Sequence, residues 1–282
     1  MKIVVTGGTG FVGKHVLPLL NEMEIHLFSR ENINLFDREA VFTAMEKIRP
    51  HYLLHIAWHT TPFVYWQSPE NLLWLKSSLD LFEAFIVHGG KRAVGVGSCA
   101  EYAPSKKPCI EGITPVVPPS LYGACKESLR MSAERLCQLG GVSFAWARLF
   151  YPYGPHEKRE RLIAYVTNSL LERSSFTLHA FHKVQDFIYI EDAARALVAL
   201  LQSSVEGSVN IASGRGIPLG RVVQKIQEQF GEQPLEEPTV TEAESVVADI
   251  TRLKEEVQWK PQISLEKGLE QTIAWWKHEA HY

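Results

Sequence analysis

The sequence predicts an α/β fold built on a doubly wound parallel sheet. Two observations lead to this prediction. Short β-branched apolar runs alternate with longer segments of helical spacing, and a glycine-rich turn directly follows the first run. Strands are expected at 2–6, 24–28, 52–57, 93–97 and 143–149, and helices at 11–21, 38–48, 70–89 and 121–138. Ligands of such folds bind at the carboxyl ends of the strands.

The composition is that of an ordinary globular protein with a large core. Of 282 residues, 45% are hydrophobic and 22% are charged, and the net charge of −3 offers no basic surface to a nucleic acid. No apolar run reaches the roughly 18 residues of a membrane span. The first strand begins at residue 2, which leaves no room for a signal peptide, and the four cysteines lack metal-ligand spacing. We therefore expect a cytoplasmic protein with free thiols and no nucleic-acid, membrane or metal partner.

The glycine-rich turn at residues 7–13 lies between a strand and a helix, which is the context that a dinucleotide-binding turn requires. Gly7 permits the tight turn, Gly10 lets the backbone approach a pyrophosphate, and Gly13 allows close packing of helix and strand. The positive end of the helix dipole then favours the phosphates. The residues expected to contact the cofactor here are Gly7, Thr9, Gly10, Phe11, Val12 and Gly13.

A second motif places a phenol and an ammonium four residues apart, at Tyr122 and Lys126. On a helix this spacing brings both side chains to one face. A nearby cation favours phenolate, so we expect it to lower the tyrosine pKa from its usual value of about 10. Such a tyrosine can exchange a proton with a sugar or alcohol oxygen. The alternative is an exposed pair on a surface helix.

Together these motifs resemble the extended short-chain dehydrogenase/reductase family, in its group of NAD(P)-dependent nucleotide-sugar epimerases, dehydratases and reductases. That family combines a Gly-x-x-Gly-x-x-Gly turn with a Ser or Thr, a Tyr and a Lys. The resemblance covers nearly the whole chain. Further segments that resemble family landmarks, in order, are 54–57, 94–102, 148–155, 185–192, 210–214, 248–249 and 259–261.

The later part of the chain has a looser pattern. Residues 187–190 and 209–212 are expected as further strands of the main sheet, with a helix over 191–203 between them. The resemblance implies a Rossmann domain with a smaller, interleaved C-terminal substrate domain. The boundaries that it implies are 1–155 plus about 181–212 for the Rossmann domain, and 156–180 and 213–282 for the substrate domain.

The resemblance also implies roles for individual residues. Tyr122 would be the acid/base, Lys126 would tune it and bind ribose, and Ser98 would hold the substrate oxygen while a hydride moves between nicotinamide and a sugar carbon. Other cofactor contacts implied at strand ends are Ile56, Ala57, Trp58 and Phe150. The implied substrate contacts are His59, Thr60, Ser98, Cys99, Ala100, Tyr151, Arg161 and Gln185.

The end of the second strand favours NADP as the cofactor. An acidic residue there would bond the ribose hydroxyls of NAD, but Ser29 and Arg30 stand in its place, and a guanidinium can bond a 2′-phosphate twice. If Arg30 only stacks on adenine, NAD remains usable. Asn34 and Leu35 are expected beside the adenine, whereas Asp37 is predicted to cap a helix.

Three reactions share this machinery, and the substitutions favour one of them. Family dehydratases carry an acidic pair after the catalytic Ser or Thr, where this chain has Cys99 and Ala100; Glu101 is expected to point elsewhere. Family epimerases often carry Asn and Arg where this chain has Tyr151 and Gln185. The lost positive charge could come from nearby cations, namely Lys158, Arg159, Arg161 and Lys183.

Reduction of a nucleotide-linked 4-keto-6-deoxyhexose is therefore the first expectation, because a reductase needs only the triad, an exchangeable cofactor and a ketone. A nucleotide-sugar 4-epimerase is the alternative, and a non-catalytic dinucleotide sensor is a second one. Trp66 and Trp74 are interpreted as packing residues. A homodimer is a further state that the resemblance implies.

Overall fold

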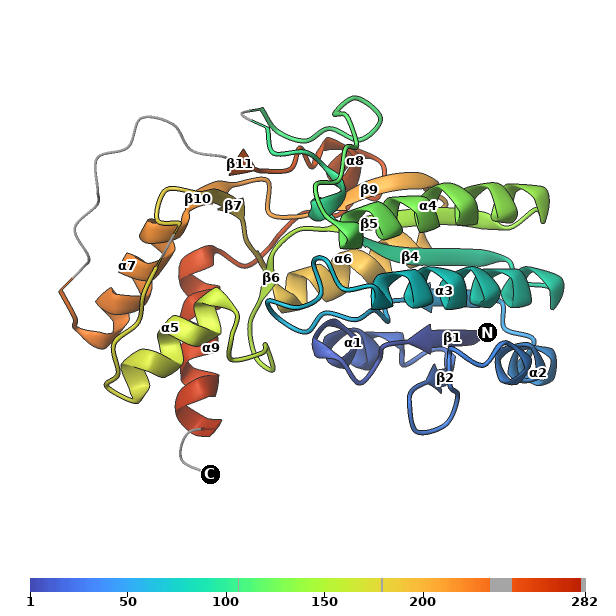
Figure 1. Cartoon of the computed structure of the whole chain (residues 1–282), viewed down its shortest axis with the longest axis horizontal. Coiled ribbons are helices and arrows are strands. Elements are labelled where there is room, and N and C mark those ends of the chain that lie inside the picture. Colours follow the sequence, from blue (N-terminus) through green and yellow to red (C-terminus); the bar gives the residue numbers. More distant parts are fainter. Residues whose placement is uncertain (106, 179, 234–244, 280–282) are drawn as a thin grey trace.

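The computed structural model describes residues 1–105, 107–178, 180–233 and 245–279, and it confirms the predicted α/β fold (Figure 1). The main sheet has six strands in the order β2-β1-β3-β4-β5-β9. All of its neighbouring strands are parallel. The strands are β1 (Lys2–Thr6), β2 (Glu24–Phe28), β3 (Tyr52–His55), β4 (Arg92–Ser98), β5 (Ser143–Leu149) and β9 (Gly207–Ile211).

Helices cover both faces of this sheet, and each face has its own apolar core. One face carries α2 (Arg38–Ile48), α3 (Glu70–Val87) and α4 (Leu121–Leu139). The other carries α1 (Phe11–Val16), its 3₁₀ continuation η1 (Leu17–Leu20) and α6 (Ile190–Gln202). Because helices cover both faces, successive strand residues are buried on either side, and apolar residues run continuously instead of alternating with polar ones. Within the described residues, no helix is long and apolar enough to cross a membrane.

A second group of elements lies to one side of the main sheet, where Figure 1 shows α5, α7 and α9 together. These helices share a third apolar core with two short sheets. The helices are α5 (Leu162–Leu171), α7 (Leu219–Phe230) and α9 (Leu265–Glu279); α8 (Thr251–Glu255) packs near β9 instead. One short sheet pairs β6 (Pro152–Tyr153) with β8 (Ile188–Tyr189), and the other has the order β10 (Gly216–Pro218), β7 (Val184–Asp186), β11 (Ser245–Val246).

The strand expected at 187–190 is therefore misplaced in the prediction, whereas the one at 209–212 does join the main sheet as β9. Apolar periodicity identifies a buried strand but does not say which sheet it enters. Here Tyr189 pairs with Tyr153, and both rings lie in the third core rather than beneath the main sheet. Parts of the expected substrate domain, residues 179, 234–244 and 280–282, lie outside the described residues.

Asp186, at the end of β7, joins these two groups of elements. Its buried carboxylate accepts hydrogen bonds from the N–H groups of Ser213 (2.9 Å), Gly214 (3.0 Å) and Ala248 (3.2 Å), and from the Ser213 hydroxyl (2.5 Å). Ser213 and Gly214 directly follow β9, so one side chain fixes the exit of the main sheet against the second group. A charged acceptor with four donors is a strong local constraint.

Replacing Asp186 with Asn tests this constraint. The amide keeps the size of the side chain but turns an N–H group toward existing donors, so we expect a loss of about 2 kcal/mol or more in the free energy of unfolding. Urea unfolding followed by circular dichroism measures it. The matched control is Asp37→Asn, because Asp37 caps the N–H of Ala40 at the surface and Asn caps equally well. An equal, small effect of both substitutions would contradict the role of Asp186.

Candidate active site

The carboxyl ends of the central strands open onto a cavity of about 250 Å³. Ser98, Tyr122 and Lys126 line it together with the glycine turn, as the sequence predicts. The predicted site residues that line this cavity are Gly7, Gly10, Phe11, Val12, Ile56, Ala57, Trp58, Thr60, Ser98, Cys99, Tyr122, Lys126, Phe150, Tyr151 and Arg161. Segments far apart in the sequence therefore meet at one edge of the sheet, as parallel topology requires.

The glycine turn fits a dinucleotide because its backbone is bare where side chains would otherwise stand. Gly7 has φ +73°, and a Cβ there would lie 2.7 Å from the backbone nitrogen of Ala57. A Cβ on Gly13 would lie 2.2 Å from the carbonyl oxygen of Gly7. In the described chain no side chain caps α1, so its first N–H groups remain available to phosphate oxygens. These residues would hold the pyrophosphate of a bound NAD or NADP.

A chain of hydrogen bonds fixes the strand ends beside this turn. The backbone N–H of Ala57 donates to Thr6 Oγ1 (3.2 Å), and Thr6 Oγ1 lies 2.7 Å from His55 Nδ1. On its other side His55 Nε2 lies 2.9 Å from Ser78 Oγ, which donates to the carbonyl of Trp74 (2.6 Å). This arrangement requires a neutral His55 with its proton on Nε2. Burial agrees, because it lowers the pKa of His55 to about 3.

Ser98 ends β4 and begins a single 3₁₀ turn, η2 (Cys99–Glu101). Its hydroxyl accepts the N–H of Ala100 (3.1 Å), and its own N–H donates to Glu101 Oε1 (2.7 Å). The two bonds form a reciprocal capping box, which holds the serine in one backbone conformation. Its side chain also hydrogen-bonds Tyr122.

Helix α4 carries the other two predicted catalytic residues, Tyr122 and Lys126. Ser120 caps its start by accepting the N–H of Gly123 (3.2 Å), which places Tyr122 and Lys126 in the first turns, on the face that meets the sheet. Lys126 Nζ donates to the carbonyl of Val96 (2.8 Å) and lies 4.0 Å from the centroid of the Trp58 ring. The pair is thus buried, and the alternative of an exposed surface pair is wrong.

Burial, rather than the nearby cation, dominates the electrostatics of this pair. It lowers the pKa of Lys126 to about 7, and the charge of Glu101 opposes that shift. Burial also raises the pKa of Tyr122 well above its usual value; Tyr65 adds to this effect, and the hydrogen bond from Ser98 opposes it. The expectation that Lys126 lowers the tyrosine pKa is therefore wrong, because desolvation of the buried phenolate dominates the shift.

An aromatic wall that the sequence did not predict stands over Tyr122. The rings of Tyr65 and Trp66 lie 4.8 and 5.8 Å from its ring, both nearly perpendicular to it. Trp66, interpreted from sequence as a packing residue, lines the cavity and is 41% exposed, whereas Trp74 is buried as expected. The available signal was two adjacent aromatics in the loop that follows Ala57. Other lining residues missed from the sequence are Val96, Gly97, Leu149 and Pro152.

Three of the expected substrate contacts do not line the cavity. The ring of His59 is held by Glu70 (3.0 Å) and Thr61 (2.9 Å). The carbonyl of Ala100 packs against α4, where a Cβ on Gly123 would lie 2.3 Å from it. Gln185 lies on β7 and hydrogen-bonds Tyr151, so it supports a lining residue instead of facing the cavity.

The expected adenosine contacts also lie outside the cavity, and their role stays a prediction. Arg30 is exposed just beyond β2, and the N–H of Ser29 donates to the Asn32 side chain (2.8 Å). Asn34 accepts the N–H of Phe36 (3.1 Å) in a turn, while Leu35 packs against a core cluster. Two residues predicted at the glycine-rich segment also do not line the cavity: Thr9, which is exposed, and Gly13, which is buried in α1.

Two cations reach across the mouth of the cavity from the segment before α5. Lys158 Nζ donates to the carbonyl of Thr60 (3.2 Å), and the Arg161 guanidinium lies 5.6 Å from the centroid of the Tyr65 ring. Arg159 turns away and binds Asn168 and Glu172. Lys158 and Arg161 are therefore placed to meet an anionic ligand, whereas Arg159 is not.

The parallel sheet, the bare glycine turn and the buried Ser, Tyr and Lys side chains define a Rossmann-fold protein of the short-chain dehydrogenase/reductase class. Residues 3–212 match the NAD-dependent epimerase/dehydratase family, and the chain belongs to that family.

Known proteins similar to this chain act on nucleotide sugars. It is 24% identical to UDP-glucuronic acid decarboxylase 1 of Arabidopsis thaliana over 97% of this chain and 69% of the relative. It is 24% identical to UDP-glucuronate 4-epimerase of Thermodesulfobacterium geofontis, over 92% and 82% of the two chains. Among solved structures, UDP-glucose 4-epimerase of Thermus thermophilus in complex with NAD superposes with a TM-score of 0.85 at 25% identity, covering 98% and 99%.

The depressed pKa of His55 predicts how stability depends on pH. Between pH 6.5 and about 3 the unfolded chain binds a proton that the folded chain excludes, so stability is full above pH 6.5 and falls as the pH drops. The His55 contribution approaches about 1.4 kcal/mol per pH unit. Urea unfolding at pH 7, 6 and 5 should show that the free energy of unfolding falls less steeply with decreasing pH in His55→Asn than in wild type. The control is His26→Asn, at a partly exposed position; a wild-type slope in His55→Asn would contradict the account.

Proposed function

We propose that this protein is an NADPH-dependent reductase of a nucleotide-linked 4-keto-6-deoxyhexose. One observation carries the proposal: the cavity holds the Ser98, Tyr122 and Lys126 side chains, while none of the described residues that line it is Asp, Glu or His. Reduction of a ketone needs a single proton donor, whereas dehydration needs a further acid and base. Cys99 cannot fill that role, because burial raises its pKa to about 12.

The state of the buried pair fits reduction. Burial keeps Tyr122 a neutral phenol, and a neutral phenol can donate its proton to the carbonyl oxygen of a ketone as the carbon receives a hydride. Ser98, fixed by its capping box, donates a hydrogen bond to the same oxygen. Lys126 supplies positive charge beside the phenol while it stays protonated. The bound nicotinamide supplies the hydride.

The cavity wall supports a deoxysugar and the mouth supports a diphosphate. Aromatic and apolar side chains, including Tyr65, Trp66 and Phe150, make up much of the wall and suit the 6-methyl group of a deoxyhexose better than a hydroxymethyl group. Lys158 and Arg161 flank the mouth and suit phosphate oxygens.

The cofactor preference rests on Arg30. It lies exposed just beyond β2, where other members of this fold class bind the adenosine ribose. A guanidinium there can bond a 2′-phosphate twice, so we propose NADP over NAD. The similar solved structure carries NAD, which leaves NAD usable at this type of site.

A nucleotide-sugar 4-epimerase is the second candidate, and the comparisons favour it: a relative and a solved structure similar to this chain are both 4-epimerases. An epimerase oxidises and re-reduces the same carbon and consumes no cofactor. Tightly bound NAD with epimerisation in the absence of added cofactor would therefore replace the reductase proposal.

Absorbance at 340 nm separates the two candidates. NADPH, and in parallel NADH, is mixed with the protein and dTDP-4-keto-6-deoxyglucose. A reductase consumes the signal, and Arg30 predicts faster loss with NADPH. No loss with either cofactor, on protein that co-purifies with dinucleotide, would contradict the reductase and favour the epimerase or another nucleotide sugar.

Replacing Tyr122 with Phe removes the proton donor and leaves the ring. We expect kcat to fall by about 10²- to 10⁴-fold, with the dinucleotide Kd nearly unchanged. Steady-state kinetics and fluorescence titration with NADPH measure the two quantities. A variant that keeps full turnover would refute the role of Tyr122, and a full cellular function without turnover would indicate a sensor.

Replacing Arg30 with Ala tests the cofactor proposal. Loss of a charge-assisted phosphate contact should raise the KM for NADPH by roughly 10- to 100-fold and leave that for NADH nearly unchanged. Arg135→Ala, which removes an exposed arginine from α4, is the control. Equal effects of Arg30→Ala on both cofactors would show that Arg30 does not bind a 2′-phosphate.

A further inference from the structure

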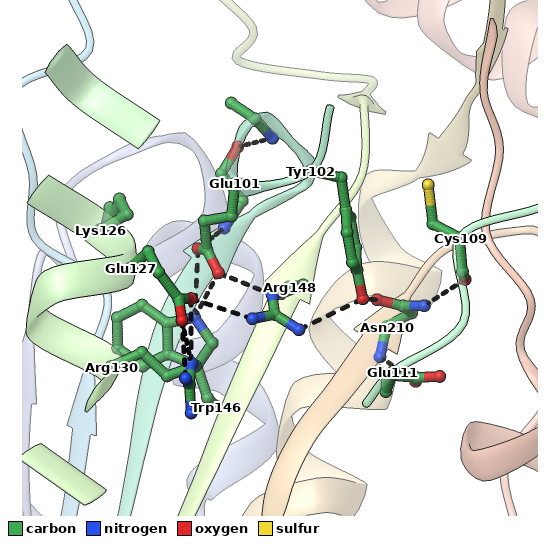
Figure 2. A network of polar contacts seen from close by, with 12 residues as sticks. Glu101, Tyr102, Cys109, Glu111, Lys126, Glu127, Arg130, Trp146, Arg148 and Asn210 are labelled. Carbon is green, nitrogen blue, oxygen red and sulfur yellow. Dashed lines mark hydrogen bonds and ion pairs between the residues drawn. The ribbon is translucent and has the colours of Figure 1, made fainter. Parts of the chain in front are cut away.

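A fully buried carboxylate, Glu101, lies outside the residues that line the cavity (Figure 2). Its Oε1 accepts the N–H of Ser98 (2.7 Å) and its Oε2 accepts Arg148 Nε (2.6 Å). The indole N–H of Trp146 reaches both oxygens, at 3.1 and 3.0 Å. The side chain therefore points away from the cavity, as the sequence suggested, yet it contacts the backbone of a cavity residue.

Glu101 is an anion in this setting. Burial raises its pKa, but Arg148, Ser98 and Trp146 all oppose that shift. Every group within hydrogen-bond reach of its oxygens is an N–H donor, and a protonated carboxyl would turn its own hydrogen toward one of them. A donor-only environment that includes a guanidinium selects the ionised, acceptor-only form.

The carboxylate cannot leave this position easily, because its partners are themselves held. Arg148 also donates to Glu127 (3.0 Å) and to the hydroxyl of Tyr102 (3.2 Å), which donates in turn to Asn210 (3.1 Å), as Figure 2 shows. The strand leaves space for it as well. A Cβ on Gly97 would lie 2.4 Å from Glu101 Oε1 and 2.1 Å from Trp146 Nε1.

The same anion acts on Lys126. Lys126 is 2% exposed, and its ammonium donates to the Val96 carbonyl, a neutral partner. A buried ammonium with only neutral partners loses its proton readily. The Glu101 carboxylate lies against Gly97, the residue that follows Val96 in β4. Its negative charge counteracts the loss of the Lys126 proton.

We propose that Glu101 is a positioning residue of the active site, which fixes the backbone of Ser98 and holds Lys126 in its charged form. The inference rests on the proposed function for the roles of Ser98, Tyr122 and Lys126. It assigns two separable tasks to one side chain. The length of the side chain sets the Ser98 contact, and its charge sets the protonation of Lys126.

Two substitutions separate these tasks. Glu101→Gln keeps the length and an oxygen for Ser98 but removes the charge. Glu101→Asp keeps the charge and is too short to hold both Ser98 and Arg148. Glu127→Gln is the matched control, since it removes another carboxylate from Arg148 while leaving the contact to Ser98 intact.

The first readout needs no substrate. Carbon-13 NMR of labelled lysine side chains, with Lys126→Arg used for assignment, follows the titration of Lys126 in each variant. We expect Glu101→Gln to move the midpoint to lower pH by about one unit or more, while Glu101→Asp and Glu127→Gln stay close to wild type. An unchanged midpoint in folded Glu101→Gln would overturn the proposal.

Kinetics supply the second readout. Deprotonation of Lys126 should appear as a fall in kcat/KM as the pH rises. In Glu101→Gln the midpoint of that fall should move with the NMR midpoint, whereas Glu101→Asp should lower kcat and leave the pH dependence of kcat/KM unchanged. If Glu101→Gln does not fold, the double variant Glu101→Gln/Arg148→Met, which removes both buried charges, takes its place. Its midpoint should move to lower pH by a smaller amount, because loss of the Arg148 cation partly offsets loss of the anion. The proposed function and the role of Glu101 can fail separately. If the Lys126 midpoint falls in Glu101→Gln as expected but wild type does not reduce keto-sugars, the proposed function is contradicted and the charge effect of Glu101 stands.

Discussion

The contact between the first turns of α4 and the end of β4 is the constraint on which the site depends. It buries Lys126 against the carbonyl of Val96 and the ring of Trp58, and it places Tyr122 beside Ser98. Removing both side chains from water makes the phenol a neutral acid and leaves the ammonium close to losing its proton at neutral pH. The protonation states of Tyr122 and Lys126 are therefore set mainly by desolvation and only secondarily by neighbouring charges.

Missing side chains allow close packing on both sides of the site. Gly97 leaves room on β4 for the Trp146 ring and the Glu101 carboxylate, and Gly13 lets α1 approach the turn at Gly7. One face of β4 thus supports a buried anion while its end presents Ser98 to the cavity. The bare glycine turn leaves backbone N–H groups free at the end of β1, where phosphate oxygens of a dinucleotide would bind. Close backbone approach at both places shapes the edge of the sheet on which the proposed function rests.

Sequence alone predicted what lies next to regular elements. Ser98, Tyr122, Lys126 and the glycine turn were found because strand ends and helical spacing fix where such residues point. The wall residues Tyr65 and Trp66 were missed because a loop has no period that shows which side chains face a cavity. The raised pKa of Tyr122 was missed for another reason: a sequence shows neighbours along the chain but not the depth at which they are buried.

The central claim is that this cavity transfers a hydride to a sugar ketone with Tyr122 as the proton donor. NADPH carrying deuterium at the transferred position of C4, one stereoisomer at a time, tests it directly with dTDP-4-keto-6-deoxyglucose as the acceptor. The account predicts that one isomer, and not the other, adds a single deuterium to the sugar at C4, seen as a one-unit mass increase in the product. A converted sugar free of deuterium with both isomers would contradict it.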